Sequence, residues 1–257
     1  MRLAHQVYLI ARRSLVRTMR QPGVVIPPLT FPLMLMAVNS SGLRAATHLP
    51  GFPTDSFLAF FIPFSFIQGA LFASGIAGTD LAKDIDTGFM NRLALTPMRG
   101  SALLLGQMGG AVGLGVVQAV IYLLVGLGAG VEIESGVAGA LLILVLATLI
   151  CCGFGALGLW IALRTGSTEG VQSQFPLLFF FTFISSMNLP RNLIEVDWFR
   201  DIATVNPVSY MIEGIRSLVI EGWNAQALAL GFGLTIAVLL FAMTIAARQL
   251  RVRMART

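Results

Sequence analysis

Charged residues are scarce in this 257-residue sequence, since Asp, Glu, Lys and Arg together make up only 11% of it. A soluble globular domain carries roughly 25% charged residues. Hydrophobic residues make up 56% of the chain, and the mean hydropathy is +0.83. These values exclude an ordinary soluble domain and predict an integral membrane protein.

Histidine, cysteine and lysine are rarer still, and each shortage argues against a kind of chemistry. The two histidines, His5 and His48, lie outside the long apolar stretches and predict no metal site between helices. The adjacent Cys151 and Cys152 imply no disulfide framework. The single lysine, Lys83, belongs to no GxxxxGK[ST] motif, so no P-loop is expected. Because HExxH and GxSxG are missing too, we expect neither an enzyme nor a cofactor on this chain.

Long stretches without Asp, Glu, Lys or Arg are what the sequence has instead. A helix needs about 20 apolar residues to cross a membrane, whereas the strands of a barrel would show alternation over about ten residues. We therefore expect an all-α membrane protein with six transmembrane helices. The six stretches are residues 21–43, 56–79, 100–131, 135–163, 170–190 and 222–247.

The polar residues inside these stretches are uncharged. An ion-coupled carrier places a carboxylate or a basic residue within the bundle to carry the coupling ion, so this class is disfavoured. Gln68 and Gln118 lie deepest and are candidates to line a path. Hydrogen bonding between helices is the more common role of such residues.

Basic residues are distributed unevenly over the loops. Six helices put both termini on one side, and all but four of the 17 Lys and Arg residues fall on that side. The positive-inside rule then places both termini in the cytoplasm. The pI near 10.0 follows from arginines that flank membrane helices, which indicates membrane lipids as partners and no nucleic acid.

Two segments outside the apolar stretches have helical spacing. Residues 1–20 predict an amphipathic helix on the membrane surface, although a basic flank without ordered structure is the alternative. Residues 188–224 predict one or two short helices that dip back against the outer face of the membrane. In that segment Asn206 suits an N-cap, and Pro207 suits the first helical position.

Charges also cluster between the second and third apolar stretches, in DLAKDIDTGFMNRLALTPMRGSALLLGQ, residues 80–107. Asp86 or Thr87 can cap a short helix that Pro97 ends. That helix presents an apolar patch, and charged neighbours keep the rest of it soluble. A short cytoplasmic helix held between two spans can transmit a push from another subunit. The patch comprises Phe89, Met90 and Leu93, and the charged neighbours are Asp84, Asp86 and Arg92.

Three segments together resemble the permease subunits of ABC type-two transporters, in particular the daunorubicin-resistance-like exporters. They are DTGFMNRLALTPMRGSALLLG after the second stretch, LRTGSTEGVQSQFPLLFFFTFISSMNLP across the fifth, and VNPVSYMIEGIRSL on the outer side. The resemblance covers nearly the whole chain, as a single permease domain over residues 1–257. Asn91 stands where the family often has an acid, and Gly100 where it has an arginine. The Glu-Ala-Ala loop of importers is not found, which favours export.

The resemblance implies the type V exporter fold in the inner (plasma) membrane of a bacterium. Two permease copies, identical or different, would pair above cytoplasmic ABC ATPase subunits that bind ATP and Mg. A coupling helix over residues 86–95 would insert into the ATPase beside the N-terminal helix. The first, second and fifth spans would line the path, and the outer segment would gate its exit.

The resemblance also assigns roles to individual residues, in four groups. These are Asp84, Asp86, Thr87, Gly88, Phe89, Met90, Asn91, Arg92 and Leu93 for coupling to the ATPase; Arg13, Arg17 and Arg20 in the interfacial helix; Asn39, Phe64, Gln68, Gln172 and Gln174 as path-lining candidates; and Asn206, Pro207, Tyr210, Glu213 and Arg216 at the outer gate.

The substrate is not specified by the sequence. Phenylalanine-rich spans suit a hydrophobic or amphiphilic compound such as a drug, a lipid or a natural product. A lipid-linked polysaccharide is the alternative within the family. An ion-coupled carrier or a channel that works without an ATPase is the alternative from a different class, and it leaves the helix over residues 86–95 without a purpose.

Overall fold

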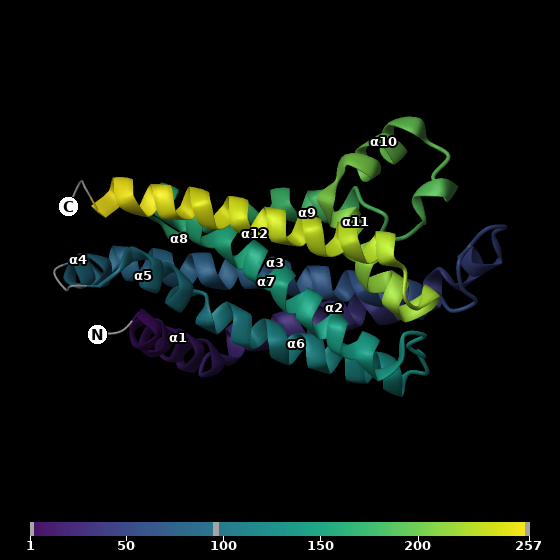
Figure 1. Cartoon of the computed structure of the whole chain (residues 1–257), viewed down its shortest axis with the longest axis horizontal. Helices are drawn as coiled ribbons and strands as arrows, with labels where there is room; N and C mark the ends of the chain where they lie inside the picture. The colour runs from purple at the N-terminus through teal and green to yellow at the C-terminus, as the bar shows by residue number, and fades with distance from the viewer. Residues whose placement is uncertain (1–2, 95–97, 255–257) are drawn as a thin grey trace.

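The computed structural model describes residues 3–94 and 98–254, and the regular structure of these residues is helical (Figure 1). Five helical segments within them are long and apolar enough to cross a membrane. Both chain ends lie at one end of the bundle in Figure 1, here called the terminal end, and α10 (Asp197–Val205) lies toward the far end. The five segments are α2 (Pro22–Gly42), α3 (Phe57–Asp86), α5 (Gly100–Gln107) continued by α6 (Gly109–Gly128), α7 (Gly136–Thr165) and α12 (Ala225–Met254).

The fifth apolar stretch does not form the continuous helix that we expected. It is divided into α8 (Thr168–Gln172) and α9 (Phe175–Phe183), with Ser173 and Gln174 between them. Pro176 explains the break, because proline has no N–H to donate to the carbonyl of Gln172 four residues earlier. Neither helix has the length of a full span. The prediction of six continuous spans is therefore replaced by five full-length spans and one broken segment.

Helix α3 is the centre of the bundle and is buried on all sides over most of its length. Its closest neighbour is α7, which crosses it at a pair of glycines. A Cβ atom on Gly158 would lie 2.0 Å from the carbonyl oxygen of Ser74, and one on Gly78 would lie 2.8 Å from that of Gly158. Only residues without a side chain permit this approach, as in other tightly packed membrane helices.

Helix α2 stays helical although Pro27, Pro28 and Pro32 lie inside it. Because Pro32 has no N–H, the carbonyl of Pro28 lacks its usual helical partner. The hydroxyl of Tyr122, from α6, donates a hydrogen bond to that carbonyl. A neighbouring helix thus satisfies the backbone group that the proline leaves open, as a helix away from water requires.

The N-terminal helix α1 (Leu3–Met19) forms as predicted, but its buried face is mostly polar and small: Gln6, Ile10, Ser14 and Thr18. This face packs against a stripe of glycines on α5 and α6. A Cβ atom on Gly106 would lie 2.5 Å from the Cβ of Ile10, and one on Gly109 would lie 2.6 Å from the Cα of Ala11. Helix α1 thus packs closely against the backbone of α5 and α6, because glycine has no side chain to keep the helices apart.

Short helices close both ends of the bundle. At the terminal end α4 (Phe89–Ala94) follows α3. Toward the far end, Asn206 caps α11 by accepting a hydrogen bond from the Val208 amide, and proline begins that helix, which confirms both predictions there. The remaining short elements are η1 (Arg44–His48), η2 (Arg191–Leu193), α10 (Asp197–Val205), α11 (Pro207–Arg216) and the π-helical turn η3 (Ser217–Glu221).

Candidate functional site

Charged side chains from α1 and α3 meet near the terminal end of the bundle. Arg13 and Arg17 lie one turn apart on α1, and Asp80 and Asp84 lie one turn apart on α3, so each pair shares a helix face. The two guanidinium nitrogens of Arg13 donate to the two oxygens of Asp84, each over 2.8 Å. Nη1 of Arg17 lies 3.1 Å from Asp84 Oδ1, and its Nε lies 3.5 Å from Asp80 Oδ1.

A third helix completes this group of contacts. Nε2 of Gln107, the last residue of α5, donates to Asp84 Oδ2 over 2.6 Å. The Asp84 side chain is only 3% exposed, and a carboxylate so deeply buried is stable only when charged and polar partners surround it. We call Arg13, Arg17, Asp80, Asp84 and Gln107 the Asp84 cluster. It joins α1, α3 and α5.

The short helix α4 is attached to the same cluster. The guanidinium carbon of Arg13 lies 4.0 Å from the centroid of the Phe89 ring, a cation–π contact. Arg13 is thereby in contact with both Asp84 and the first residue of α4. Gly88, with φ of 68°, makes the sharp turn from α3 into α4, a backbone conformation that other residues adopt at a cost.

The structure corrects three expectations about this loop. Helix α3 continues through Asp86, so the predicted coupling helix begins later, at Phe89. Thr87 caps the end of α3, where its hydroxyl donates to the Lys83 carbonyl over 2.8 Å, and it does not begin the next helix. Asp84 is buried in an ion pair and does not serve to keep the loop soluble.

The predicted apolar patch is only partly available to a partner. Met90 is buried against the bundle, and Phe89 and Leu93 are half-buried. Asp86, Thr87 and Arg92 are exposed around them, and so is Arg20, which follows α1 outside the Asp84 cluster. Asn91 belongs to α4, whereas the predicted helix end at Leu95 and the stop at Pro97 lie outside the described residues.

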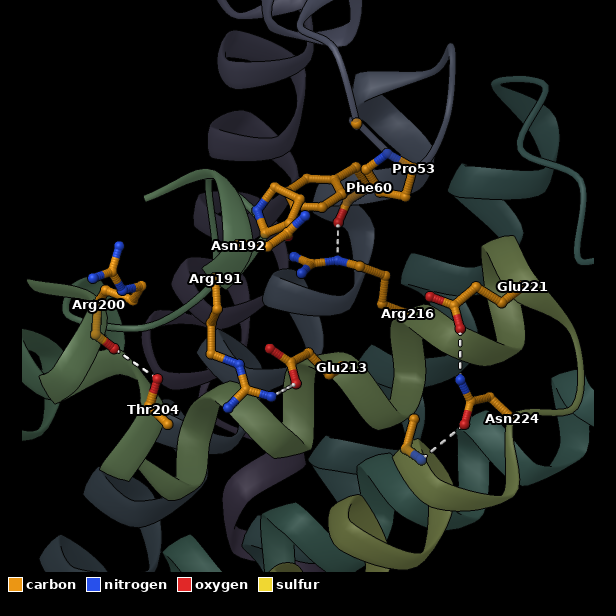
Figure 2. Close-up of a pocket in the computed structure, with 13 residues that line it drawn as sticks. Pro53, Phe60, Arg191, Asn192, Arg200, Thr204, Glu213, Arg216, Glu221 and Asn224 are labelled. Atoms are coloured by element: carbon orange, nitrogen blue, oxygen red, sulfur yellow. Dashed lines mark hydrogen bonds and ion pairs between the residues drawn. The ribbon is translucent and has the colours of Figure 1, made fainter. Parts of the chain in front are cut away.

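A second group of polar residues surrounds a cavity of 620 Å³ toward the far end (Figure 2). Nε of Arg216 donates to the Phe60 carbonyl over 3.1 Å, and its Nη2 donates to the carbonyls of Ser186 and Met187 over 2.9 and 3.3 Å. The guanidinium also lies 3.5 Å from the centroid of the Phe60 ring. This one side chain ties α11 to α3 and to the loop after α9.

Burial lowers the pKa of Arg216 to about 9, while Glu213 and Glu221 act in the opposite direction. The side chain therefore keeps its positive charge at neutral pH. Such a buried cation is stable because carbonyl dipoles and an aromatic face replace its water. We call the cavity, with its lining, the Arg216 pocket.

Of the other predicted gate residues, Glu213 lines the Arg216 pocket (Figure 2). Tyr210 contacts residues of the lining. Glu213 Oε2 accepts from Arg191 Nη2 over 2.6 Å, and Arg191 also stacks on Tyr210, with 4.4 Å between its guanidinium carbon and the ring centroid. The Tyr210 hydroxyl donates to the Thr204 carbonyl over 2.8 Å. Nδ2 of the Asn206 side chain donates to the carbonyls of Phe181 and Ile184, each over 2.6 Å.

Comparison with known protein families identifies the family of the chain in which these two groups of residues occur. The profile of the ABC-2 type transporter family matches residues 5–220, which begin in α1 and end in η3. This chain belongs to the ABC-2 type transporter family. The matched part includes the Asp84 cluster and Arg216, whereas Glu221, Asn224 and Ala227 of the pocket lining lie beyond it. The match confirms the resemblance seen in the sequence.

A known relative of this ABC-2 permease is the daunorubicin resistance ABC transporter permease protein DrrB1 of Streptomyces coeruleorubidus. The two are 27% identical over 207 residues, which is 76% of this chain and 67% of the relative. As an ABC-2 permease, the chain is a multi-pass transport subunit and not an enzyme.

The five path-lining candidates do not come together within one copy of the ABC-2 permease. Phe64 and Gln68 are fully buried in α3, and among the described residues neither polar atom of the Gln68 side chain has a hydrogen-bond partner. The Asn39 side chain donates to the Leu35 carbonyl of its own helix over 2.9 Å. Gln172 is exposed and Gln174 half-buried at the break between α8 and α9.

Sequence reasoning missed an aromatic surface of the permease that joins α2, α3 and α9. Phe31 and Phe72 have ring centroids 6.3 Å apart, and Phe72 and Phe175 are 5.6 Å apart. Phe179 and Phe183 continue the row at 5.9 and 4.8 Å. All five rings are half-buried or exposed, and we call them the aromatic face. The abundance of phenylalanine was visible in the sequence, but its gathering on one side depends on how three helices pack.

Proposed function

We propose that this ABC-2 permease is half of an ATP-driven exporter with both termini in the cytoplasm of a bacterial cell membrane. Two copies would pair, most simply as a homodimer, on cytoplasmic ABC ATPase subunits that bind ATP and Mg²⁺. The observation that carries the proposal is the Asp84 cluster. It links α4, the helix that we propose meets the ATPase, to the helix at the centre of the bundle.

The contacts form a continuous route from α4, through Arg13 and α3, to Arg216. A push on α4 reaches Arg13 through the Phe89 ring, and Arg13 passes it to α3 through its two hydrogen bonds with Asp84. Helix α3 runs without interruption from Phe57 to Asp86 and spans about 45 Å at 1.5 Å per residue. Near its other end the Phe60 carbonyl accepts from Arg216. Movement of α4 is thereby coupled to the Arg216 pocket, which we propose as the outer gate.

The aromatic face supports a path between two copies of the permease. It combines parts of the first, second and fifth apolar stretches and leaves aromatic rings unburied in a single copy. A substrate that slides along phenylalanine rings is hydrophobic or amphiphilic, such as a drug, a lipid or a natural product. In this arrangement α8, α9 and the loop up to residue 190 complete a sixth, broken crossing.

Association with an ATPase provides the direct test of the proposed function. Arg92 is exposed on α4, so Arg92→Glu reverses a charge at the proposed contact without disturbing the core. We expect the variant to retain less ATPase after affinity purification and to lower ATP-driven export. Arg164→Glu reverses the same charge at the end of α7 and serves as the matched control. Equal ATPase retention by Arg92→Glu, Arg164→Glu and the unmodified permease would contradict the proposed docking site.

A further inference from the structure

A groove of 950 Å³ lies between α5 and α12, at the terminal end of the bundle. Its walls are mostly apolar, but three exposed arginines line it: Arg99 beside α5, and Arg248 and Arg251 on α12. No carboxylate is among its lining residues. The described lining of the groove therefore combines an apolar surface with three positive charges.

Along both walls of the groove, the arginines and the apolar side chains follow one another in the same order. On α12, Leu240 and Arg248 lie two turns apart on the same face, about 12 Å along the helix axis. Leu240 is 62% exposed and belongs to the apolar part of the helix. On the other wall Arg99 caps α5, and Leu105, 45% exposed, lies deeper. Both walls thus place arginine at the end of the bundle and leucine toward its middle.

Three other arginines at this end of the bundle contact groups of the protein itself. Arg13 and Arg17 are paired with Asp84, and Nη1 of Arg253 donates to the Leu163 carbonyl over 3.2 Å. Within residues 3–94 and 98–254, the guanidinium groups of the three groove arginines have neither an ion pair nor a hydrogen bond. As far as the described residues go, these three charges can therefore bind a ligand from outside the chain.

We infer that this groove binds an anionic phospholipid of the cytoplasmic leaflet, with its phosphate on the three arginines and an acyl chain along the leucines. Guanidinium groups suit phosphate oxygens because they donate two parallel hydrogen bonds. Basic pockets between membrane helices on the cytoplasmic side bind anionic lipid headgroups for this reason. The inference depends on the proposed function only for the orientation of the chain.

Such a lipid would lie next to the coupling machinery. Arg99, Gly100 and Met254 line the groove and also line a small neighbouring cavity beside Met90 and Leu93. A lipid held by Arg99 therefore contacts residues that also line the cavity beside Met90 and Leu93 of α4. This places lipid composition among the factors that set the position of α4.

Native mass spectrometry of the purified permease in detergent, titrated with phosphatidylglycerol or phosphatidylcholine, tests the inference. We expect a preference for phosphatidylglycerol that Arg248→Gln/Arg251→Gln weakens about 25-fold, at roughly fivefold for each basic residue. The control, Arg12→Gln/Arg164→Gln, removes two exposed charges outside the groove and should keep the preference. An unchanged preference in the groove variant, or an equal loss in the control, would overturn the inference.

Two further measurements distinguish binding of a lipid from binding of a free anion. Leu240→Trp fills the apolar part of the groove and should weaken phosphatidylglycerol binding while leaving the arginines in place. Soluble glycerol phosphate should compete poorly, and competition as strong as that of the lipid would show a simple anion site instead. Because no ATPase is present in these measurements, their failure would leave the proposed ATPase contact untouched.

Discussion

At the residue scale, several of the few charged residues of the permease lie in two buried groups of contacts. Asp84 is surrounded by two arginines and a glutamine, and Arg216 by three carbonyls and an aromatic ring. A buried ion that loses its partners costs far more than an exposed pair contributes. Substitutions of Asp84, Arg216 or their partners should therefore destabilise the protein more than substitutions of exposed charged residues.

Removal of both arginines from the Asp84 cluster should destabilise the protein strongly. Arg13→Gln/Arg17→Gln leaves the buried carboxylates without cations, and we expect a loss of about 3–5 kcal/mol in the free energy of unfolding. Arg12→Gln, at an exposed position of the same helix, should change it by less than about 0.5 kcal/mol. Denaturant unfolding in detergent measures both values. Similar values for the two variants would show that the cluster does not stabilise the fold.

Arg216→Lys tests the geometry of the pocket while it keeps the charge. A lysine has no planar fork with which to reach carbonyls on two different segments, so we expect the loop after α9 to loosen. Hydrogen exchange of residues 184–196 should increase relative to the unmodified protein. Arg164→Lys makes the same exchange at an exposed arginine at the end of α7, and it should leave this segment protected. Unchanged exchange in Arg216→Lys would mean that charge alone holds the loop.

At the element scale, glycines decide where helices can meet. Glycines on α5 and α6 receive α1, and Gly78 and Gly158 bring α3 and α7 together. The Gly109 and Gly113 spacing was visible in the sequence, but without neighbours it could not be assigned to a particular contact. The structure assigns it to α1, whose buried face is small and polar enough to lie against a glycine surface.

Gly109→Val should displace α1 from the bundle. The new side chain would meet the backbone of Ala11 at 2.6 Å, a contact that side-chain rotation cannot relieve. We expect about 1–3 kcal/mol of destabilisation and faster hydrogen exchange over residues 3–19. Gly128→Val lies on the same helix with nothing within 4 Å and is the matched control. Protection of α1 that persists in Gly109→Val would rule out close packing as its anchor.

The sequence predicted elements better than it predicted their junctions. The apolar stretches located five spans, and Asn206 with Pro207 located the start of α11, because a cap and a proline act locally. The break near Pro176 was missed because a search for charge-free stretches is blind to a lost backbone donor. Asp84 was taken for a solvated loop residue, since nothing local shows that Arg13, 71 residues away, reaches it.

At the scale of the whole molecule, α3 connects the two candidate sites. Its Asp84 is held by the helices next to α4, and its Phe60 carbonyl holds the Arg216 pocket near the other end. A permease that belongs to the ABC-2 family but has no P-loop needs such a connection to use ATP bound elsewhere. We therefore propose that the Asp84 cluster couples ATP hydrolysis to export.

The ratio of substrate exported to ATP hydrolysed, measured in proteoliposomes that contain the permease and its ATPase, tests this claim most directly. Asp84→Asn keeps the size of the side chain but removes the charge that Arg13 and Arg17 hold. We predict that the variant still binds the ATPase and hydrolyses ATP while export per ATP falls at least tenfold, about 1.4 kcal/mol of lost coupling. An unchanged ratio in a folded Asp84→Asn permease would contradict the account.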